Sequence, residues 1–276
     1  MPLPTNIPKR LFQTSKTAKL SPIERAAQRN LQLLHPEWEY QFYDDDKIID
    51  FVRKNFPDLF SVFVGFPRAI QRVDLFRYLV VYKFGGFYFD LDVFFSEPID
   101  EVTPYSAVFP FEELTISRYL RDEMGIDWEI GNYGFGASAN HPFLGAIIDN
   151  CVKAQTVSGW SDKMLHEVPS LWRKDYEVLY TTGPGLVTRT LAENAKFDST
   201  VHVLFPDDVC SERNQHQFGR FGVHQMAASW RVKGGLCKRK LALMWESRRR
   251  ATQLVSSRRL GGTRSYPRIQ STHALG

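Results

Sequence analysis

A short aromatic segment that ends in two aspartates constrains this chain more than any other feature. Residues 85–95 read Gly-Gly-Phe-Tyr-Phe-Asp-Leu-Asp-Val-Phe-Phe, and the apolar run predicts a buried strand over 87–95. Carboxylates in such a run are costly unless something neutralises them. In an extended segment Asp90 and Asp92 point to the same side, where they can share a hard cation such as Mg²⁺ or Mn²⁺. The segment therefore predicts a divalent metal site of the kind that binds a diphosphate.

A helix is predicted immediately before this strand. Six apolar residues between 68 and 84 recur close to helical spacing, and Gly85-Gly86 is typical of the left-handed turn that ends a helix. Asp74 and Arg77 lie three residues apart, so they share one face of this helix. Such a pair is usually a surface ion pair, and by itself it indicates little about function.

Strands and helices alternate along the rest of the chain. Short strands are predicted at 9–14, 40–43, 107–110 and 201–206. Helices are predicted at 22–34, 44–56, 142–154 and after the turn at 182–185. The first helix begins with Ser21-Pro22-Ile23-Glu24, a capping-box sequence with proline at the first helical position. The alternation predicts an α/β fold, a single Rossmann-like domain with a mostly parallel central sheet.

Charge divides the chain near residue 230. Residues 231–276 hold 12 Lys or Arg and one acidic residue, Glu246, so they carry +11 and leave −7 for the rest of a chain whose net charge is +4. We predict a catalytic domain at 1–230 and a basic extension, partly helical or disordered, at 231–276. The extension is either simply solvated or attracted to an anionic membrane surface. No aromatic-studded basic module accompanies the charge, so nucleic acid is not an expected partner.

Cysteine usage and hydropathy bear on the compartment. The three cysteines, Cys151, Cys210 and Cys237, are far apart and form no Cys-x-x-Cys pair, which fits a reducing environment. The N-terminal residues have no apolar core of signal-peptide length, and no apolar run reaches the roughly 18 residues of a membrane span. We therefore expect a cytoplasmic protein, in peripheral contact with a membrane if the basic extension binds one.

The aromatic segment resembles the signature of the family 32 glycosyltransferases. Gly85-Gly86-Phe87-Tyr88-Phe89-Asp90-Leu91-Asp92 is similar to the Gly-Gly-x-Tyr-x-Asp-x-Asp of this sugar-binding DXD group, which includes initiating mannosyltransferase-like proteins and capsular polysaccharide transferases. Five further blocks resemble those of the family in the correct order: 7–14, 74–78, 132–142, 182–184 and 224–230. The resemblance covers roughly residues 7 to 230. One departure is Phe12, which stands where histidine is usual.

The resemblance implies a GT-A fold, retention of anomeric configuration, and a bound Mn²⁺ or Mg²⁺ ion. It implies that Asp90, Asp92 and His224 form the metal shell, with Asp90 also able to meet the ribose of the donor. The implied donor is a nucleotide sugar, and the implied acceptor is a glycan or a lipid-linked glycan. The resemblance does not identify the sugar, the nucleotide or the linkage.

The resemblance also assigns a donor site. Asp74 and Arg77 would hold the donor sugar, with the Arg77 guanidinium donating in a fixed fork. Asn132 would approach the sugar or the acceptor, and Ser229-Trp230 would close over the diphosphate. The predicted catalytic group comprises Asp74, Arg77, Asp90, Asn132 and Trp230. The wider predicted donor-binding set comprises Phe12, Gln13, Thr14, Asp74, Arg77, Tyr78, Gly86, Asp90, Leu91, Gly183, Ser229 and Trp230.

The expected reaction moves a hexose or an N-acetylhexosamine to the acceptor. A front-face retaining mechanism needs no protein base, because an oxygen of the leaving group accepts the acceptor proton; Glu129 and Asp127 are the alternatives as base or nucleophile. Two other functions remain open. One is a haloacid-dehalogenase-like phosphatase, whose nucleophile loop also follows a hydrophobic strand, although that scheme has no place for the Gly-Gly break. The other is a non-catalytic nucleotide-sugar-binding protein.

Overall fold

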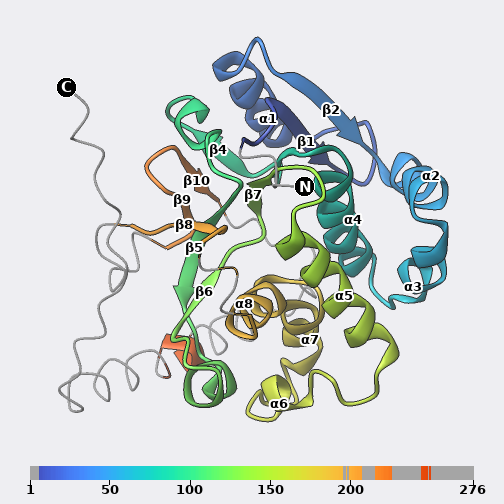
Figure 1. The fold of residues 1–276 in the computed structure, drawn as a ribbon, viewed down its shortest axis with the longest axis vertical. Helices are drawn as coiled ribbons and strands as arrows, with labels where there is room; N and C mark the ends of the chain where they lie inside the picture. The colour runs from blue at the N-terminus through green and yellow to red at the C-terminus, as the bar shows by residue number, and fades with distance from the viewer. Residues whose placement is uncertain are drawn as a thin grey trace.

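A seven-stranded sheet forms the centre of the molecule (Figure 1). The computed structural model describes residues 6–194, 197, 199–206, 215–225, 244–247 and 249. The sheet has the order β2-β1-β3-β7-β5-β6, and β8 pairs with β5. Its strands are β1 (Arg10–Thr14), β2 (Glu39–Tyr43), β3 (Gly86–Phe89), β5 (Ala107–Leu114), β6 (Trp128–Ile130), β7 (Gly134–Ala137) and β8 (His202–Leu204).

Most strands of this sheet point the same way. β1 pairs in parallel with β2 and β3, and β5 pairs in parallel with β8. β7 is antiparallel to both β3 and β5, so it joins two groups of strands that share one direction, and β6 is antiparallel to β5. Only β6 and β7 of these seven strands therefore run against the rest. The predicted α/β class and the mostly parallel sheet are confirmed.

The helices other than α1 cover one face of the sheet (Figure 1). The larger core lies beneath them, where Phe12, Tyr88, Phe109 and Phe135 from four neighbouring strands meet side chains of α4 and α5. The helices are α1 (Pro22–Leu34), α2 (Asp45–Asn55), α3 (Phe60–Gly65), α4 (Ala69–Phe84), α5 (Pro142–Thr156), α6 (Asp162–Leu165), α7 (Arg173–Thr181) and α8 (Pro184–Ala192). Shorter turns lie at Pro57–Leu59, Asp100–Val102 and Tyr119–Glu123.

The other face of the sheet packs against α1 and a second, smaller sheet. Leu11, Phe87 and Phe89 alternate with the residues of the larger core and point to this side, as the period of two requires. The small sheet has the order β4-β10-β9, with β4 at Val93–Phe95, β9 at Gln217–Phe218 and β10 at Gly222–His224. A hairpin late in the chain therefore lies against a strand from its middle.

The helix α4 runs through the middle of the larger core. The predicted helix at 68–84 is found at 69–84, and Gly85 ends it with φ of +67°. A side chain at Gly85 would be strained in that conformation and would meet the backbone of Ala139 at 2.8 Å. Because both sides of the helix are covered, polar side chains on it are buried as well, among them Asp74 and Arg77.

The predicted helix starts at 22 and 44 are also found. Ser21 and Glu24 form the expected capping box, and Asp44 accepts a hydrogen bond from the backbone of Lys47 at 3.1 Å. The acidic run at 44–46 thus has a structural explanation at the start of α2.

The prediction of one strand over 87–95 is wrong. β3 ends at Phe89, a turn closed by the backbone of Val93 on the carbonyl of Asp90 (3.2 Å) follows, and β4 belongs to the small sheet. Asp90 and Asp92 therefore lie on a tight turn and not on an extended segment. Apolar residues flank the two aspartates on both sides because both strands are buried, so hydrophobicity alone does not reveal where one strand ends.

The strand β7 was not predicted because two of its four residues are glycines. The missing side chains of Gly134 and Gly136 leave room for the rings of Phe89 and Phe87, which a Cβ would overlap. Glycine is depleted in most strands, but here it permits close packing of aromatic rings on the neighbouring strand. Residues 134–137 thus form the strand of the sheet next to β3.

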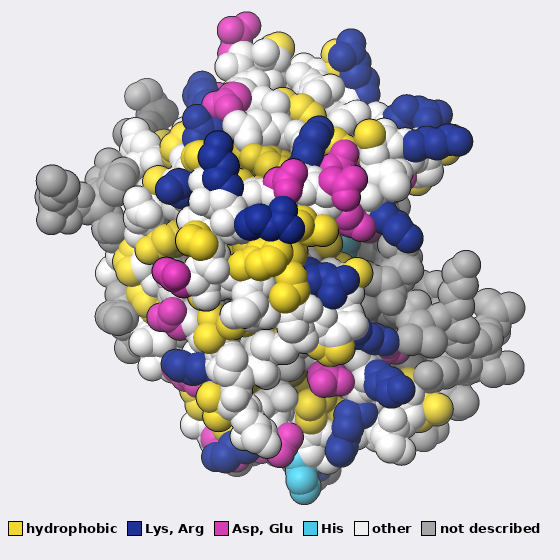
Figure 2. Space-filling view, turned by 90° about the vertical axis from the view of Figure 1, so that its right-hand side faces the viewer, with side chains coloured by type: hydrophobic (Ala, Val, Ile, Leu, Met, Phe, Trp, Pro, Cys, Tyr) yellow, Lys and Arg dark blue, Asp and Glu magenta, His cyan; other side chains and the backbone are white. Residues whose placement is uncertain are grey.

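Charged side chains of both signs lie on the surface. Figure 2 shows that Lys and Arg side chains are interspersed with Asp and Glu around exposed apolar side chains on one face.

Residues 244–247 are helical, and the ring of Trp245 packs 5.5 Å from that of Trp172. Glu246 is buried and accepts a hydrogen bond from Tyr176. No helix among the described residues has both the length and the apolar character that crossing a bilayer requires.

Candidate active site

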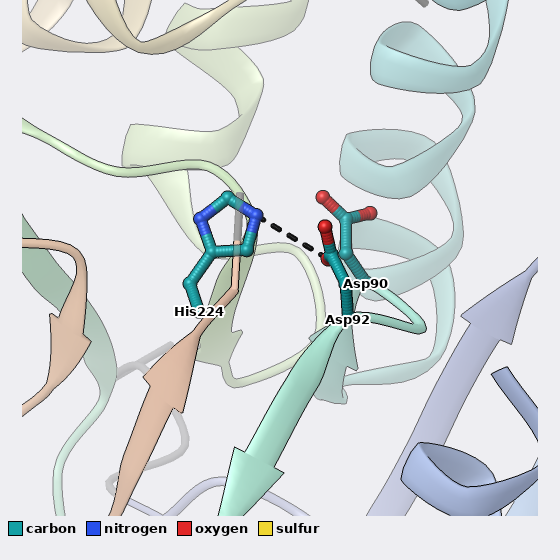
Figure 3. Close-up of side chains that lie close together, drawn as sticks. All are labelled: Asp90, Asp92 and His224. Carbon is teal, nitrogen blue, oxygen red and sulfur yellow. Dashed lines mark ion pairs between the residues drawn. The ribbon is translucent and has the colours of Figure 1, made fainter. Parts of the chain in front are cut away.

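Three side chains that could hold a metal ion, called the metal group below, lie together beyond the carboxyl end of β3. Asp90 and Asp92 lie on the turn between β3 and β4, and His224 ends β10; one ligand atom from each lies within 4.8 Å of the others. Figure 3 shows the imidazole of His224 facing the two carboxylates, with Nε2 3.3 Å from Oδ1 of Asp92. The structure therefore brings together the three residues that were predicted to bind metal, at the sheet edge where α/β proteins bind ligands.

The chemistry of these three groups fits a divalent cation. Two carboxylates and one imidazole nitrogen suit Mn²⁺ well and Mg²⁺ acceptably. The side chains of Asp92 and His224 are 20% and 14% exposed, so an ion and its phosphate ligands have access to them. Burial raises the pKa of Asp90, Arg77 lowers it, and the charge of Asp92 raises it again. A cation between the two carboxylates would remove that repulsion.

Arg77 connects the metal group to a buried polar network. Its Nη1 donates to the backbone oxygen of Asn132 at 2.7 Å and to Oδ2 of Asp90 at 3.3 Å, and its Nη2 lies 3.2 Å from Oδ1 of Asp74. Its guanidinium also lies 4.6 Å from the centre of the Tyr88 ring. Burial lowers the pKa of Arg77, but the carboxylates of Asp90 and Asp74 raise the pKa by more than burial lowers it. The guanidinium therefore stays charged. Both terminal nitrogens of the guanidinium therefore have partners, whereas its Nε is buried and has no hydrogen-bond partner among the described residues.

Asp74 is buried with a donor on each oxygen. Its Oδ2 accepts from the Thr182 hydroxyl at 2.8 Å, and its Oδ1 accepts from the Asn132 side-chain amide at 3.3 Å. Burial raises the pKa of Asp74 to about 7, against the opposing effects of Arg77 and Thr182. Tyr78 completes the network, because its hydroxyl donates to the Thr182 carbonyl and accepts from Asn132. These four residues come from α4, the loop before β7 and the end of α7.

The other oxygen of Asp90 is held by hydroxyl groups. Tyr88 donates to Oδ1 of Asp90 at 2.7 Å, and the Tyr88 and Thr14 hydroxyls lie 2.9 Å apart. Gln13 is fully buried, and its side-chain amide lies 3.5 Å from the Asp90 carbonyl while its oxygen accepts from Tyr40. The end of β1 thus supports the turn that carries the metal group.

The remaining predicted donor-binding residues divide into two groups. Leu91 lies on the turn itself, and Gly183 caps α8 where a Cβ would meet Leu179. Phe12 and Gly86 instead lie within the sheet: the Phe12 ring packs on Phe84 in the larger core, and Gly86 lies against the backbone of β1.

Two predicted donor-site residues, Ser229 and Trp230, lie outside the described residues. Glu129, one of the alternative bases, is buried on β6 and accepts a hydrogen bond from the Thr115 hydroxyl at 2.5 Å. Asp127, the other alternative, lies next to β6, where its carbonyl accepts from the backbone of Thr115.

Sequence reasoning missed Tyr88 and Thr182 as members of the site. Both lie inside blocks that were recognised, but each was treated as part of a pattern and not as a side chain with a partner. Tyr88 precedes Asp90 by two residues, and in the extended segment that the sequence predicted such residues share one side, so alternation could have identified it. Thr182 could not be found in this way, because its contact with Asp74 joins residues 108 positions apart.

Comparison with known proteins identifies this region. Residues 22–109 match the family described as "Glycosyltransferase sugar-binding region containing DXD motif". This part of the chain is therefore similar to the sugar-binding region of the DXD glycosyltransferases. The matched segment includes α4, the Gly85-Gly86 break and both aspartates of the turn, and the predicted resemblance is confirmed. The match favours a glycosyltransferase over the phosphatase alternative.

Relatives of the chain include named mannosyltransferases. Inositol phosphoceramide mannosyltransferase 3 of Schizosaccharomyces pombe is 31% identical over 144 residues, which cover 52% of this chain and 37% of that protein. The initiation-specific alpha-1,6-mannosyltransferase of the same yeast is 26% identical over 216 residues, which cover 70% of this chain and 50% of that protein. Among solved structures, the UDP-bound glycosyltransferase domain of the YGT toxin is similar over 72% of this chain and 80% of that one, at 8% identity and a TM-score of 0.49. The chain thus spans about half or less of the curated relatives it matches.

Proposed function

We propose that this chain is a metal-dependent glycosyltransferase that uses a nucleotide-sugar donor. The observation that carries the proposal is the meeting of Asp90, Asp92 and His224 within 4.8 Å beside the buried Arg77. The match of residues 22–109 to the sugar-binding region of this enzyme family supports it. Mn²⁺ or Mg²⁺ is the proposed cofactor, and retention of configuration is proposed from the family resemblance alone.

Each part of the site has a distinct task in this proposal. When bound by Asp90, Asp92 and His224, the cation supplies charge neutralisation for the departing diphosphate. The buried Asp74 and the side chain of Asn132 offer hydrogen-bonding groups that can orient sugar hydroxyls. Arg77 holds Asp74 and Asp90 in fixed relation, since it contacts both carboxylates from one planar group.

We propose mannose as the first donor sugar to test and a glycolipid or glycan as the acceptor. The names of the relatives support both choices, since they include mannosyltransferases that act on inositol phosphoceramide. An N-acetylhexosamine donor remains the alternative within the same chemistry. A catalytic domain ending near residue 230, a cytoplasmic location and contact of the basic extension with anionic membrane stay predictions.

A donor-hydrolysis screen tests the proposal directly. The chain is incubated with uridine- and guanosine-linked sugars and Mn²⁺, and release of the nucleoside diphosphate is measured. We expect at least one donor to be cleaved, the activity to disappear after chelation, and Mn²⁺ to restore it. Asp50→Asn, which changes an exposed surface carboxylate, serves as the matched control for substitutions in the metal group. Full turnover after exhaustive chelation, or no cleavage of any nucleotide sugar, would contradict the proposal.

A further inference from the structure

A second histidine lies beside the one in the metal group. His216 directly precedes β9 and lies opposite His224 in the β9–β10 hairpin, where the backbone N–H of His224 donates to the carbonyl of His216 at 2.9 Å. The centres of the two imidazole rings are 6.3 Å apart. The backbones of His216 and His224 are therefore bonded directly to each other.

His216 is attached to the main sheet at two points of one residue, Glu112 of β5. The backbone N–H of His216 donates to the Glu112 carbonyl at 3.1 Å, and its ring Nδ1 lies 3.1 Å from Oε1 of the Glu112 carboxylate. The two side chains are only 15% and 13% exposed, so water competes little for this contact. Gly131 makes room for the arrangement, because a Cβ there would overlap both Glu112 and Tyr133.

The backbone of His216 is in a conformation that needs support. Its φ is +59°, in the left-handed region that non-glycine residues seldom adopt. Such conformations cost on the order of 1–3 kcal/mol and persist only where the surroundings hold them in place. The two contacts with Glu112 provide that support.

His224 lacks the device that usually orients a metal-binding histidine. In most metal sites the second ring nitrogen donates to a carboxylate or carbonyl, which fixes the ring. Here Nδ1 of His224 is buried and has no hydrogen-bond partner among the described residues. Its ring is instead stacked on Tyr133, with centroids 4.3 Å apart and planes 17° apart. Stacking fixes the plane of the ring but not its position along the hairpin.

We propose that His216, anchored by Glu112, is a positioning residue that sets where His224 presents Nε2 to the metal. The inference rests on the proposed metal-dependent function. Glu112 fixes His216 to the main sheet, the hairpin transmits that position to His224, and Tyr133 fixes the tilt of the ring. The contact with Glu112 on β5 thus orients His224. In other metal sites a hydrogen bond at Nδ1 orients the histidine.

Two substitutions at His216 separate the anchor from the backbone conformation. His216→Gly removes the ring contact but adopts φ of +59° without strain. His216→Asn keeps a side-chain N–H close to the place of Nδ1 and also tolerates the left-handed region. Asn140, with φ of +57° and no part in the site, provides the matched control Asn140→Gly.

Mn²⁺ affinity, measured by the loss of the free-ion signal in electron paramagnetic resonance, is the deciding readout. We expect His216→Gly to bind Mn²⁺ about 10- to 100-fold more weakly, as loss of an orienting partner usually does. His216→Asn and Asn140→Gly should bind close to the unchanged chain. At saturating Mn²⁺ the donor-hydrolysis rate of His216→Gly should recover most of its loss, since the ligands themselves remain.

The possible outcomes are distinguishable. Unchanged Mn²⁺ affinity in a folded His216→Gly variant would overturn the inference and leave the proposed function intact. If that variant does not fold, Glu112→Ala, which leaves His216 in place, must weaken Mn²⁺ binding in its stead, and an unchanged affinity there would overturn the inference. Absence of Mn²⁺ binding by the unchanged chain would contradict the proposed function, and the inference with it.

Discussion

The two halves of the candidate site are built in different ways. The network around Asp74 and Arg77 lies on α4 inside the larger core, and these two side chains are 5% and 3% exposed. Asp92 and His224 lie on a turn and a hairpin of the small sheet, and their side chains are 20% and 14% exposed. The first half is held by the same packing that holds the fold. The second half depends on the contact between the turn that carries Asp92 and a hairpin much later in the chain, which carries His224.

This contrast predicts which half of the site tolerates substitution. A substitution in the buried network leaves charges or donors without partners in a place that water does not reach, so stability and activity fall together. A substitution in the metal group removes a ligand from a partly exposed position, so activity should fall while the fold survives. The two halves can therefore be separated by measuring stability and turnover on the same variants.

Asp92→Asn should show the largest effect on turnover. We expect the rate to fall by roughly 10² to 10⁴, because a neutral amide replaces a carboxylate that binds the cation. The free energy of unfolding should change little, since the side chain is partly exposed. Steady-state rates at saturating Mn²⁺ and urea denaturation provide the two measurements, with Asp50→Asn as the control. Equal losses of stability and rate would mean that the metal group is also part of the structural core.

Arg77 substitutions should reduce stability and turnover together. Removing one partner of a buried ion pair usually costs about 3–5 kcal/mol, and Arg77→Ala leaves both Asp74 and Asp90 without it. We expect Arg77→Lys to be nearly as damaging, because one ammonium cannot reach two carboxylates and the Asn132 carbonyl at once. Urea denaturation and donor hydrolysis measure both losses, and Arg53→Lys is the surface control. A Lys variant with most of its activity would show that only the charge matters.

The pH dependence of stability should differ between the unchanged chain and Asp74→Asn. The pKa of Asp74 is about 7 in the folded protein and about 3.9 in an unfolded chain, so the folded state binds this proton more tightly. Its contribution is therefore complete below pH 4 and is lost as the pH rises through 7. The loss is on the order of 2–4 kcal/mol, and Asp74→Asn should not show it.

Urea denaturation between pH 4 and 8 tests this expectation. As the pH rises, the unfolding free energy of the unchanged chain should fall relative to that of Asp74→Asn. Parallel curves would mean that Arg77 and Thr182 hold Asp74 ionised throughout. In that case the hydrogen bonds that Asn132 and Thr182 donate to the two oxygens of Asp74 would be enough to stabilise its charge at neutral pH.

Much of the fold could be predicted because local signals are strong in it. The capping box at Ser21, the caps at Asp44 and the glycine at 85 each fix an element end through the chemistry of a few adjacent residues. The split of 87–95 into β3 and β4 could not be predicted in this way, because both strands are buried and the turn contains no glycine or proline. β7 was hidden by its glycines, whose role depends on Phe87 and Phe89 across the sheet.

The candidate site shows the same division. Asp90 and Asp92 were predicted from their own segment, whereas Asp74 and Arg77 gained a site role only from the resemblance of the blocks that contain them. His224 was placed by resemblance alone, since nothing near it in the sequence indicates a ligand. Thr182 and the Glu112 anchor were missed because each joins segments more than 100 residues apart. Contacts of that range depend on tertiary structure, which spacing does not encode.

The smallest expected effect on turnover belongs to the C-terminal end. Trp245 packs on Trp172, and Glu246 is buried against Tyr176 of α7, whose far end meets Thr182 of the buried network. A truncation must therefore spare residues up to about 250. Deleting 251–276 removes four arginines and, by expectation, leaves donor hydrolysis unchanged.

Vesicle binding should respond to the same deletion. Each basic residue near an anionic leaflet contributes about 1 kcal/mol, so the loss of four should weaken binding to phosphatidylserine vesicles strongly at low salt and less at ~0.15 M. Replacing the four arginines by lysine keeps the charge and should keep the binding, whereas replacing them by glutamine should match the deletion. If the truncated chain binds vesicles as well as the full chain, the end of the extension is only solvated. If it also loses donor hydrolysis, the extension supports the buried half of the site through α7, and the contrast between the two halves extends to the C-terminus.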